Sequence, residues 1–261
     1  MRKYLYSVCA IGGVLVLACA ANAQAQQAIP KGPGSLAGIW SNAEFNRSGT
    51  FIPRDGVILT ADGKLPPLQP WASELLEKRI KDAEAGRPYA TTKSICLPAG
   101  IPQMMFGPRL PIQILETPGQ VSILFEDFMN FRIIRLNKAH KEDPNPNFMG
   151  DSVGHWEGNT LVVDTIGLSE RTTLDPIGTP HSDDLHVVER IRRVDSDTIE
   201  VVVTFEDPKT FTKPWTSRTS FQPRPDVQIE EFVCENQRNE SKDGVTGMQT
   251  PSSGPLMLPR R

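Results

Sequence analysis

The side chains best suited to move a proton cluster in the second half of the chain. Three of the four histidines, His155, His181 and His186, fall within 32 consecutive residues. An imidazole changes its charge near neutral pH, so each one is a candidate general acid or base. His181 ranks first because it lies in a predicted loop with several ionisable neighbours, and His155 ranks second. A structural role is the alternative for each histidine taken alone.

A second group of charged residues lies upstream. Glu126 ends an apolar run and Arg132 enters the next one, so the two side chains come close if those runs pair as strands. Because a guanidinium binds carboxylates through paired hydrogen bonds, Arg132 and Arg109 are candidate anchors for an anionic ligand. A surface ion pair between Glu126 and Arg132 is the alternative. Aromatic side chains such as Trp156 either line a pocket for a flat ligand or belong to the core.

The sequence offers no cofactor motif. His181 and His186 are five residues apart, which is not a spacing typical of zinc sites, so we expect no metal. The chain also lacks the P-loop, G-x-G-x-x-G, G-x-S-x-G and H-E-x-x-H motifs. Nucleotide, nicotinamide and α/β-hydrolase chemistry are therefore not expected, and any catalysis would depend on side chains alone.

A β-rich fold is expected to position these side chains. From residue 110 onward, apolar and β-branched runs alternate with turn signals such as Thr117–Gln120. The strand-like alternation of side chains is clearest over Thr198–Glu206. The predicted strands are Pro111–Glu116, Gln120–Glu126, Phe131–Leu136, Ser152–Glu157, Thr160–Asp164, Leu185–Val194, Thr198–Glu206, Thr216–Phe221 and Val227–Val233. Their near-hairpin spacing, without intervening helices, predicts a mainly β, up-and-down antiparallel barrel rather than a Rossmann-type sheet.

Two features accompany the predicted barrel. Residues Pro70–Gly86 predict one packing helix, with proline in its first turn and glycine as its stop. The stretch Leu36–Trp40 opens the first strand with Gly-x-Trp, which resembles the start of lipocalins and other calycins. That resemblance implies a calycin/lipocalin-like barrel in which Trp40 closes one end. An ordinary core tryptophan is the alternative, and the domain as a whole is expected to span residues 36–235.

The two ends of the chain are expected to lie outside this domain. A basic start, an apolar run and the A-x-A site Ala21–Ala23 predict that residues 1–23 are a cleaved signal peptide and that the protein is periplasmic or otherwise exported. The glycines in the run argue against a transmembrane anchor, while lipidation of Cys19, giving an outer-membrane lipoprotein, is a further alternative. Residues 24–35 are predicted to be a linker and 236–261 a disordered tail.

Two cysteines remain after the signal peptide, Cys96 and Cys234. In an oxidising compartment a disulfide between them is the default expectation. The chain has a formal net charge of −3 and no polybasic patch, so no nucleic acid partner is expected. Nothing in the sequence indicates an oligomeric state.

Several longer motifs carry a resemblance to a known group. They are CLPAGIP at 96–102, ILETPGQVSILFED at 114–127, SVGHWEGNTLVVDTIG at 152–167, PHSDDLHVVERIRRVDSDTIEVVVTFEDP at 180–208 and PW at 214–215. In kind and order these motifs resemble a group of exported, largely uncharacterised proteins common in sphingomonads and acidobacteria. The resemblance covers roughly residues 36–235. The activity it implies is cofactor-independent decarboxylation of lignin-derived phenylcoumaran acids.

The implied reaction assigns roles to the candidate residues. A base removes a phenolic proton, the ether ring opens to a quinone methide, an acid protonates the departing aryl oxide, and loss of CO₂ gives a stilbene. Under this hypothesis His181 with Asp184 is the base. His155 or Glu126 is the acid. Arg132 or Arg109 holds the carboxylate, and His186 and Trp156 contact the substrate.

Other functions remain open at this stage. A lipocalin-like carrier of an apolar or aromatic ligand would perform no chemistry, and the Gly-x-Trp start favours it. The loop rich in His, Asp and Glu favours the lyase, because a pure carrier needs few buried ionisable groups. A hydrolase or isomerase that uses the same histidines is a third reading. If the protein is the lyase, we expect its partner to be a small aromatic acid and expect no cofactor.

Overall fold

The structure is a computed structural model that describes residues 34–42, 56–106 and 110–234. The predicted signal peptide, most of the linker, Arg109 and the predicted tail lie outside the described residues. None of the described helices is long and apolar enough to span a bilayer.

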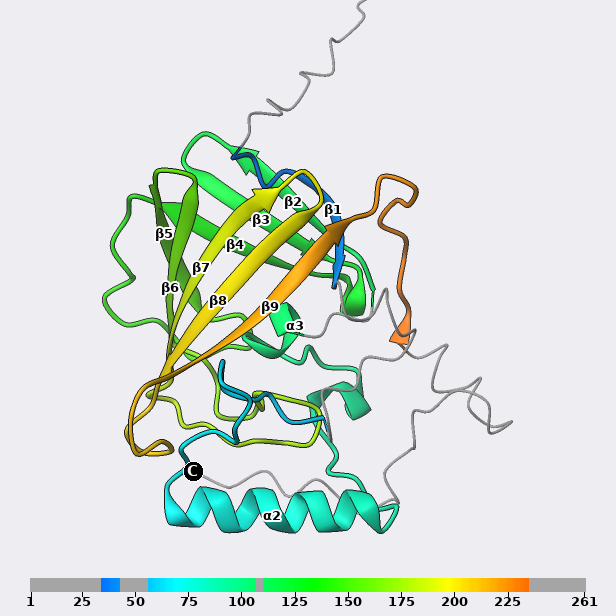
Figure 1. The fold of residues 1–261 in the computed structure, drawn as a ribbon, viewed down its shortest axis with the longest axis vertical. Coiled ribbons are helices and arrows are strands. Elements are labelled where there is room, and N and C mark those ends of the chain that lie inside the picture. The colour runs from blue at the N-terminus through cyan, green and yellow to red at the C-terminus, as the bar shows by residue number, and fades with distance from the viewer. Residues whose placement is uncertain (1–33, 43–55, 107–109, 235–261) are drawn as a thin grey trace, which may run out of the picture.

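Nine strands of the described chain close into a single barrel in sequence order (Figure 1). They are β1 (Gly38–Asn42), β2 (Ile112–Thr117), β3 (Gln120–Phe125), β4 (Asn130–Leu136), β5 (Asp151–Glu157), β6 (Thr160–Ile166), β7 (His186–Asp195), β8 (Thr198–Glu206) and β9 (Trp215–Pro223). The prediction of a mainly β, calycin-like barrel with one packing helix is confirmed.

One pair of neighbouring strands departs from the up-and-down pattern. β4 and β5 run parallel, with Ile134 opposite Ser152 and Leu136 opposite Gly154, because residues 137–150 carry the chain back along the barrel. Gly154 permits this close pairing, since a Cβ there would lie 2.9 Å from Cγ2 of Ile134. The long β4–β5 connection consequently passes over the outside of the barrel wall.

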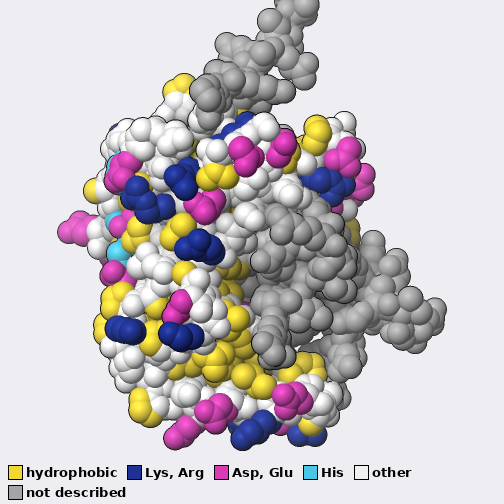
Figure 2. Space-filling model, in the orientation of Figure 1, with side chains coloured by type: hydrophobic (Ala, Val, Ile, Leu, Met, Phe, Trp, Pro, Cys, Tyr) yellow, Lys and Arg dark blue, Asp and Glu magenta, His cyan; other side chains and the backbone are white. Residues whose placement is uncertain are grey.

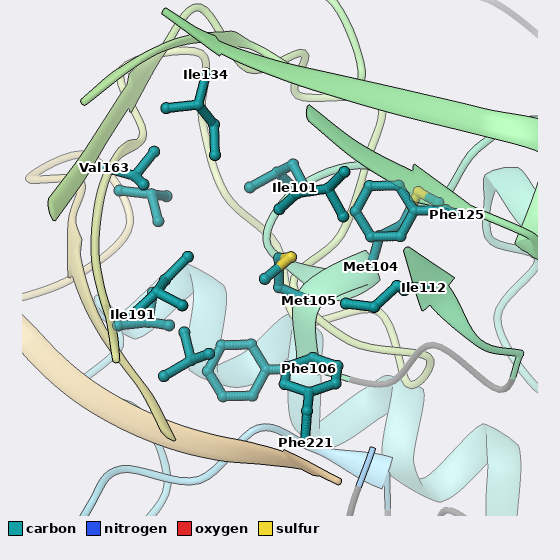
Figure 3. Packing of buried hydrophobic residues seen from close by; sticks show 14 of the residues in the cluster. Ile101, Met104, Met105, Phe106, Ile112, Phe125, Ile134, Val163, Ile191 and Phe221 are labelled. Atoms are coloured by element: carbon teal, nitrogen blue, oxygen red, sulfur yellow. The ribbon is translucent and has the colours of Figure 1, made fainter. Parts of the chain in front are cut away.

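The barrel interior is filled with side chains. Alternate residues of each strand point inward, as the sequence alternation predicted for β8, where Ile199, Val201, Val203 and Phe205 are all buried. The short helix α3 (Gln103–Phe106) adds Met104, Met105 and Phe106 to the same core (Figure 3). Trp40 is buried, and its Nε1 donates to the carbonyl of Leu36 at 2.8 Å.

The packing helix α2 (Pro70–Glu84) lies beyond one end of the barrel (Figure 1). Proline occupies its first turn and Gly86 follows its end with a φ of +75°, a conformation that favours glycine. Ala72 and Leu76 form its buried face. Two 3₁₀ turns, η2 (Thr92–Ile95) and η3 (Asp127–Met129), complete the described helices.

The segment Val227–Val233 is not a strand, so that prediction is wrong. β1 pairs with both β2 and β9, and the closed barrel therefore leaves no free edge for another strand. The segment instead leads to the Cys96–Cys234 disulfide, which joins residues 138 positions apart and confirms the predicted bridge. Just before it, the ring of Phe232 packs against that of Phe128.

Candidate functional site

Two histidines meet at one carboxylate oxygen on the outside of the barrel. Nε2 of His140 lies 3.0 Å from Oδ1 of Asp164, and Nε2 of His186 lies 2.9 Å from the same atom. Their side chains are 22% and 32% exposed, so solvent reaches both rings. Figure 2 shows histidine side chains among acidic and basic ones at the edge of the visible face.

Each imidazole also contacts a second carboxylate through its other nitrogen. Nδ1 of His140 lies 2.9 Å from Oδ2 of Asp151, and Nδ1 of His186 lies 3.1 Å from Oε2 of Glu206. The result is a continuous row, Asp151–His140–Asp164–His186–Glu206, called below the histidine–carboxylate chain. It crosses β5, β6, β7 and β8.

Strand alternation and register explain how these residues meet. Val163 and Thr165 are fully buried, so Asp164 between them faces outward. His186 pairs directly with Glu206, which places their side chains on the same outer face. His140 arrives from the β4–β5 connection, where the Lys141 backbone N–H donates to Asp151 at 3.1 Å and fixes the approach.

The hydrogen bonds of the histidine–carboxylate chain depend on which imidazole nitrogens carry a proton. A carboxylate oxygen only accepts hydrogen bonds, whereas a neutral imidazole has a single N–H. An imidazole that lies between two ionised carboxylates therefore satisfies both only when it is protonated. In the neutral form one ring nitrogen faces a carboxylate with its lone pair. Each of the two histidines thus has a carboxylate oxygen within hydrogen-bonding distance of both ring nitrogens.

Asp151 anchors one end of the chain. Burial acts to raise its pKa, but the hydrogen bonds from His140 and the Lys141 N–H, together with the charge of Arg135, outweigh burial and lower it. One terminal nitrogen of Arg135 lies 2.8 Å from both Asp151 oxygens. The other terminal nitrogen and Nε of Arg135 have no partner among the described residues.

Arg132 lies inside the barrel rather than in an open site. Its guanidinium forms a two-pronged ion pair with Glu189 and also donates to Ser152 Oγ at 3.0 Å and Thr165 Oγ1 at 2.8 Å. The expected surface pairing with Glu126 is not present, since Glu126 accepts from the Glu230 backbone N–H instead. The donors that would hold a substrate carboxylate are therefore occupied by Glu189.

His181 is enclosed by its own loop. Its Nδ1 donates to the Ser182 carbonyl at 2.7 Å, and its Nε2 lies 2.8 Å from the Thr172 hydroxyl. Burial lowers the pKa of His181 and favours the neutral ring. Asp184 is not its partner, because that carboxylate lies 2.9 Å from Lys209. Buried and neutral, His181 has the features of a structural histidine.

His155 and Trp156, the remaining predicted site residues, lie apart from the histidine–carboxylate chain and from Arg132 and His181. His155 is exposed on the outer face, with its Nε2 3.2 Å from Glu157, which also pairs with Arg190 at 2.7 Å. Trp156 is partly buried and packs against the core. The structure thus does not bring His155, His181 and Arg132 together, and among the predicted site residues only His186 belongs to the histidine–carboxylate chain.

Sequence reasoning did not identify His140, Asp151, Asp164 and Glu206 as site residues. Asp164 and His186 fall on neighbouring predicted strands, and strand alternation would have placed both on the outer face, where Asp164 lies opposite Val188, two residues from His186. His140 carried no such signal, because it lies in an irregular connection whose path depends on the parallel β4–β5 pairing.

The described residues hold no group of three or more His, Cys, Asp or Glu side chains arranged to bind a metal ion. Comparison with known proteins adds no further evidence. No family model, no curated protein and no solved structure matches the chain.

Proposed function

We propose that the protein is an exported, cofactor-independent lyase that removes CO₂ from an aromatic acid by general acid–base catalysis. The observation that carries the proposal is the convergence of His140 and His186 on one oxygen of Asp164. The reaction needs one group that takes a proton and one that gives a proton. The resemblance to the sphingomonad and acidobacterial group supplies the substrate class, a phenylcoumaran carboxylate.

The two imidazoles divide the proton transfers. His186 acts as the base, because its neighbour Glu206 is exposed and a substrate phenol displaces it from Nδ1 at little cost. His140 takes the remaining role of acid, with its Nδ1 2.9 Å from the buried Asp151. Asp164 holds both rings and keeps their Nε2 atoms within about 6 Å of each other.

The substrate carboxylate requires a cation. Arg135 lies beside the chain with Nε and one terminal nitrogen unpartnered among the described residues, so it takes the anchoring role first expected of Arg132. Lys141 adds a second positive charge, with its Nζ 3.9 Å from Asp151. These two cations offset the acidic side chains around the site.

The proposed steps balance in atoms and charge. His186 removes the phenolic proton, and the resulting phenolate expels the benzylic aryl oxide to give a quinone methide. His140 protonates that aryl oxide. The C–CO₂ bond then breaks, its electron pair forms the stilbene double bond and restores the phenolate, and His186 returns the proton. One proton is consumed per CO₂ released, and no electrons enter or leave the substrate.

The test is incubation of the purified, folded protein with a racemic phenylcoumaran carboxylate, measuring CO₂ and stilbene absorbance. We expect turnover by the wild type and a loss of at least about 100-fold in His186→Asn, the usual size of a general acid–base contribution. His155→Asn is the matched control, because this histidine is exposed and lies outside the chain. Absence of CO₂ from every such acid would overturn the proposal.

The likeness of the closed barrel to calycins suggests one second candidate, a carrier that binds the aromatic acid outside the filled interior and without reaction. The same assay separates the two functions. A carrier would retain the acid in equilibrium dialysis, yield no stilbene, and respond equally to the His186 and His155 variants.

A further inference from the structure

A pocket of about 380 Å³ lies at the end of the barrel wall, between residues 60–67 and the β8–β9 connection. Its lining includes Lys64, Leu65, Lys213, Pro214 and Trp215. We propose that this pocket is a binding site for a small aromatic carboxylate. It shares no residue with the histidine–carboxylate chain, and the proposal does not depend on the proposed lyase activity.

The two walls of the pocket are tied together at both ends. At one end the Ala61 N–H donates to the Thr216 carbonyl at 2.7 Å. At the other end the Thr212 N–H donates to the Pro67 carbonyl at 2.8 Å, and Leu68 forms a β-bridge with Phe211. Because the walls are hydrogen-bonded on either side of the opening, the pocket exists before a ligand arrives and costs little to organise.

A buried aromatic cluster lies beneath the pocket, and Trp215 is its member that reaches the lining. The Trp215 ring stacks on Phe205 with centroids 4.1 Å apart and meets Phe211 edge-on at 5.5 Å. Only 5% of Trp215 is exposed, and its buried Nε1 has no hydrogen-bond partner among the described residues. Trp215 therefore offers little more than an edge to the pocket, and Leu65, Pro67 and Pro214 supply the apolar walls that would contact an aromatic ring.

The charges in the pocket favour a single negative charge on the ligand. Asp62 and Lys64 neutralise each other at 2.7 Å, and their hydrogen bond, with one from Thr60, lowers the pKa of Asp62 to about 2. Lys213 has no hydrogen bond or ion pair with any described residue. One uncompensated ammonium group beside apolar walls suits a carboxylate attached to a ring.

Calorimetric titration of the full chain with 4-hydroxybenzoate, and with its neutral amide 4-hydroxybenzamide, tests the site. We expect the carboxylate to bind more tightly than the amide, and Lys213→Met to weaken the carboxylate about fivefold while leaving the amide unchanged. Lys81→Met on α2 is the matched control, because it removes another exposed lysine whose side chain has no partner among the described residues, and it should change nothing.

A blocking variant keeps the test decisive. Ala61→Trp adds bulk to an exposed wall position and should abolish binding of both compounds, while the far-ultraviolet circular dichroism spectrum stays that of the wild type. His155→Asn, which changes an exposed histidine outside both sites, should bind as the wild type does. Equal affinity for acid and amide, wild-type affinity in Ala61→Trp, or no binding at millimolar ligand would each overturn the proposal.

Discussion

The ion pair between Arg132 and Glu189 should be the most sensitive point in the barrel. The two side chains are 1% and 0% exposed, and both Glu189 oxygens accept from the guanidinium. Arg132→Met removes these donors but keeps most of the apolar volume, so a charged carboxylate is left buried without them. Breaking a buried pair in this way costs about 3–5 kcal/mol of the free energy of unfolding.

Urea unfolding followed by tryptophan fluorescence measures this loss. With a denaturant slope of about 2.5 kcal/mol/M, we expect the midpoint to fall by about 1–2 M. Arg192→Met is the matched control, since its pair with Glu200 at 3.0 Å is largely exposed and worth at most about 1 kcal/mol. The double variant Arg132→Met with Glu189→Leu should regain much of the stability, because no charge is then left buried.

An equal fall of the urea midpoint in Arg132→Met and Arg192→Met would contradict the claim that the buried Glu189 needs the Arg132 guanidinium. Such a result would mean that the guanidinium is not required by Glu189 and that it is free for another role. Arg132 would then return as a candidate anchor for the substrate carboxylate.

Two further predictions concern stability. Replacing Cys96 and Cys234 by alanine opens a loop of 138 residues and should cost about 5 kcal/mol, measured by urea unfolding, whereas an unchanged midpoint would contradict the structural role of the bridge. Burial lowers the pKa of His181 in the folded protein, so this histidine is protonated in the unfolded chain at a higher pH than in the folded one. As the pH falls below about 6.5, proton uptake therefore favours the unfolded chain. The free energy of unfolding then decreases by up to about 1.4 kcal/mol per pH unit. In unfolding curves between pH 7.5 and 5.5, His181→Gln should remove this loss of stability, whereas the control His155→Asn, at an exposed histidine, should retain it. An identical pH dependence in His181→Gln and the wild type would count against burial as the cause.

The local features of the fold were predictable because they follow from neighbouring residues. The alternation in Thr198–Glu206 depends only on which side chains face a core, and β8 has those bounds. The proline and glycine that bracket the helix act within a single turn, and α2 begins at Pro70 and ends two residues before Gly86. The disulfide followed from the count of cysteines and the expected compartment.

The candidate site was less predictable because it depends on contacts between distant residues. Arg132 and Glu189 are 57 residues apart and meet only because the barrel closes. Glu126 was the nearer carboxylate in the sequence, but it lies between β3 and the turn η3 and accepts from the Glu230 backbone N–H. The position of His140 depends on a connection that runs back along the barrel, and the expected purely antiparallel order hid it.

Catalysis at the histidine–carboxylate chain is tested by the rate of stilbene formation in His140→Asn, measured beside His155→Asn on the same phenylcoumaran carboxylate. If His140 and His186 act as a pair on Asp164, His140→Asn loses at least about 100-fold in rate while His155→Asn matches the wild type. Equal rates in the two variants would contradict catalysis at the histidine–carboxylate chain.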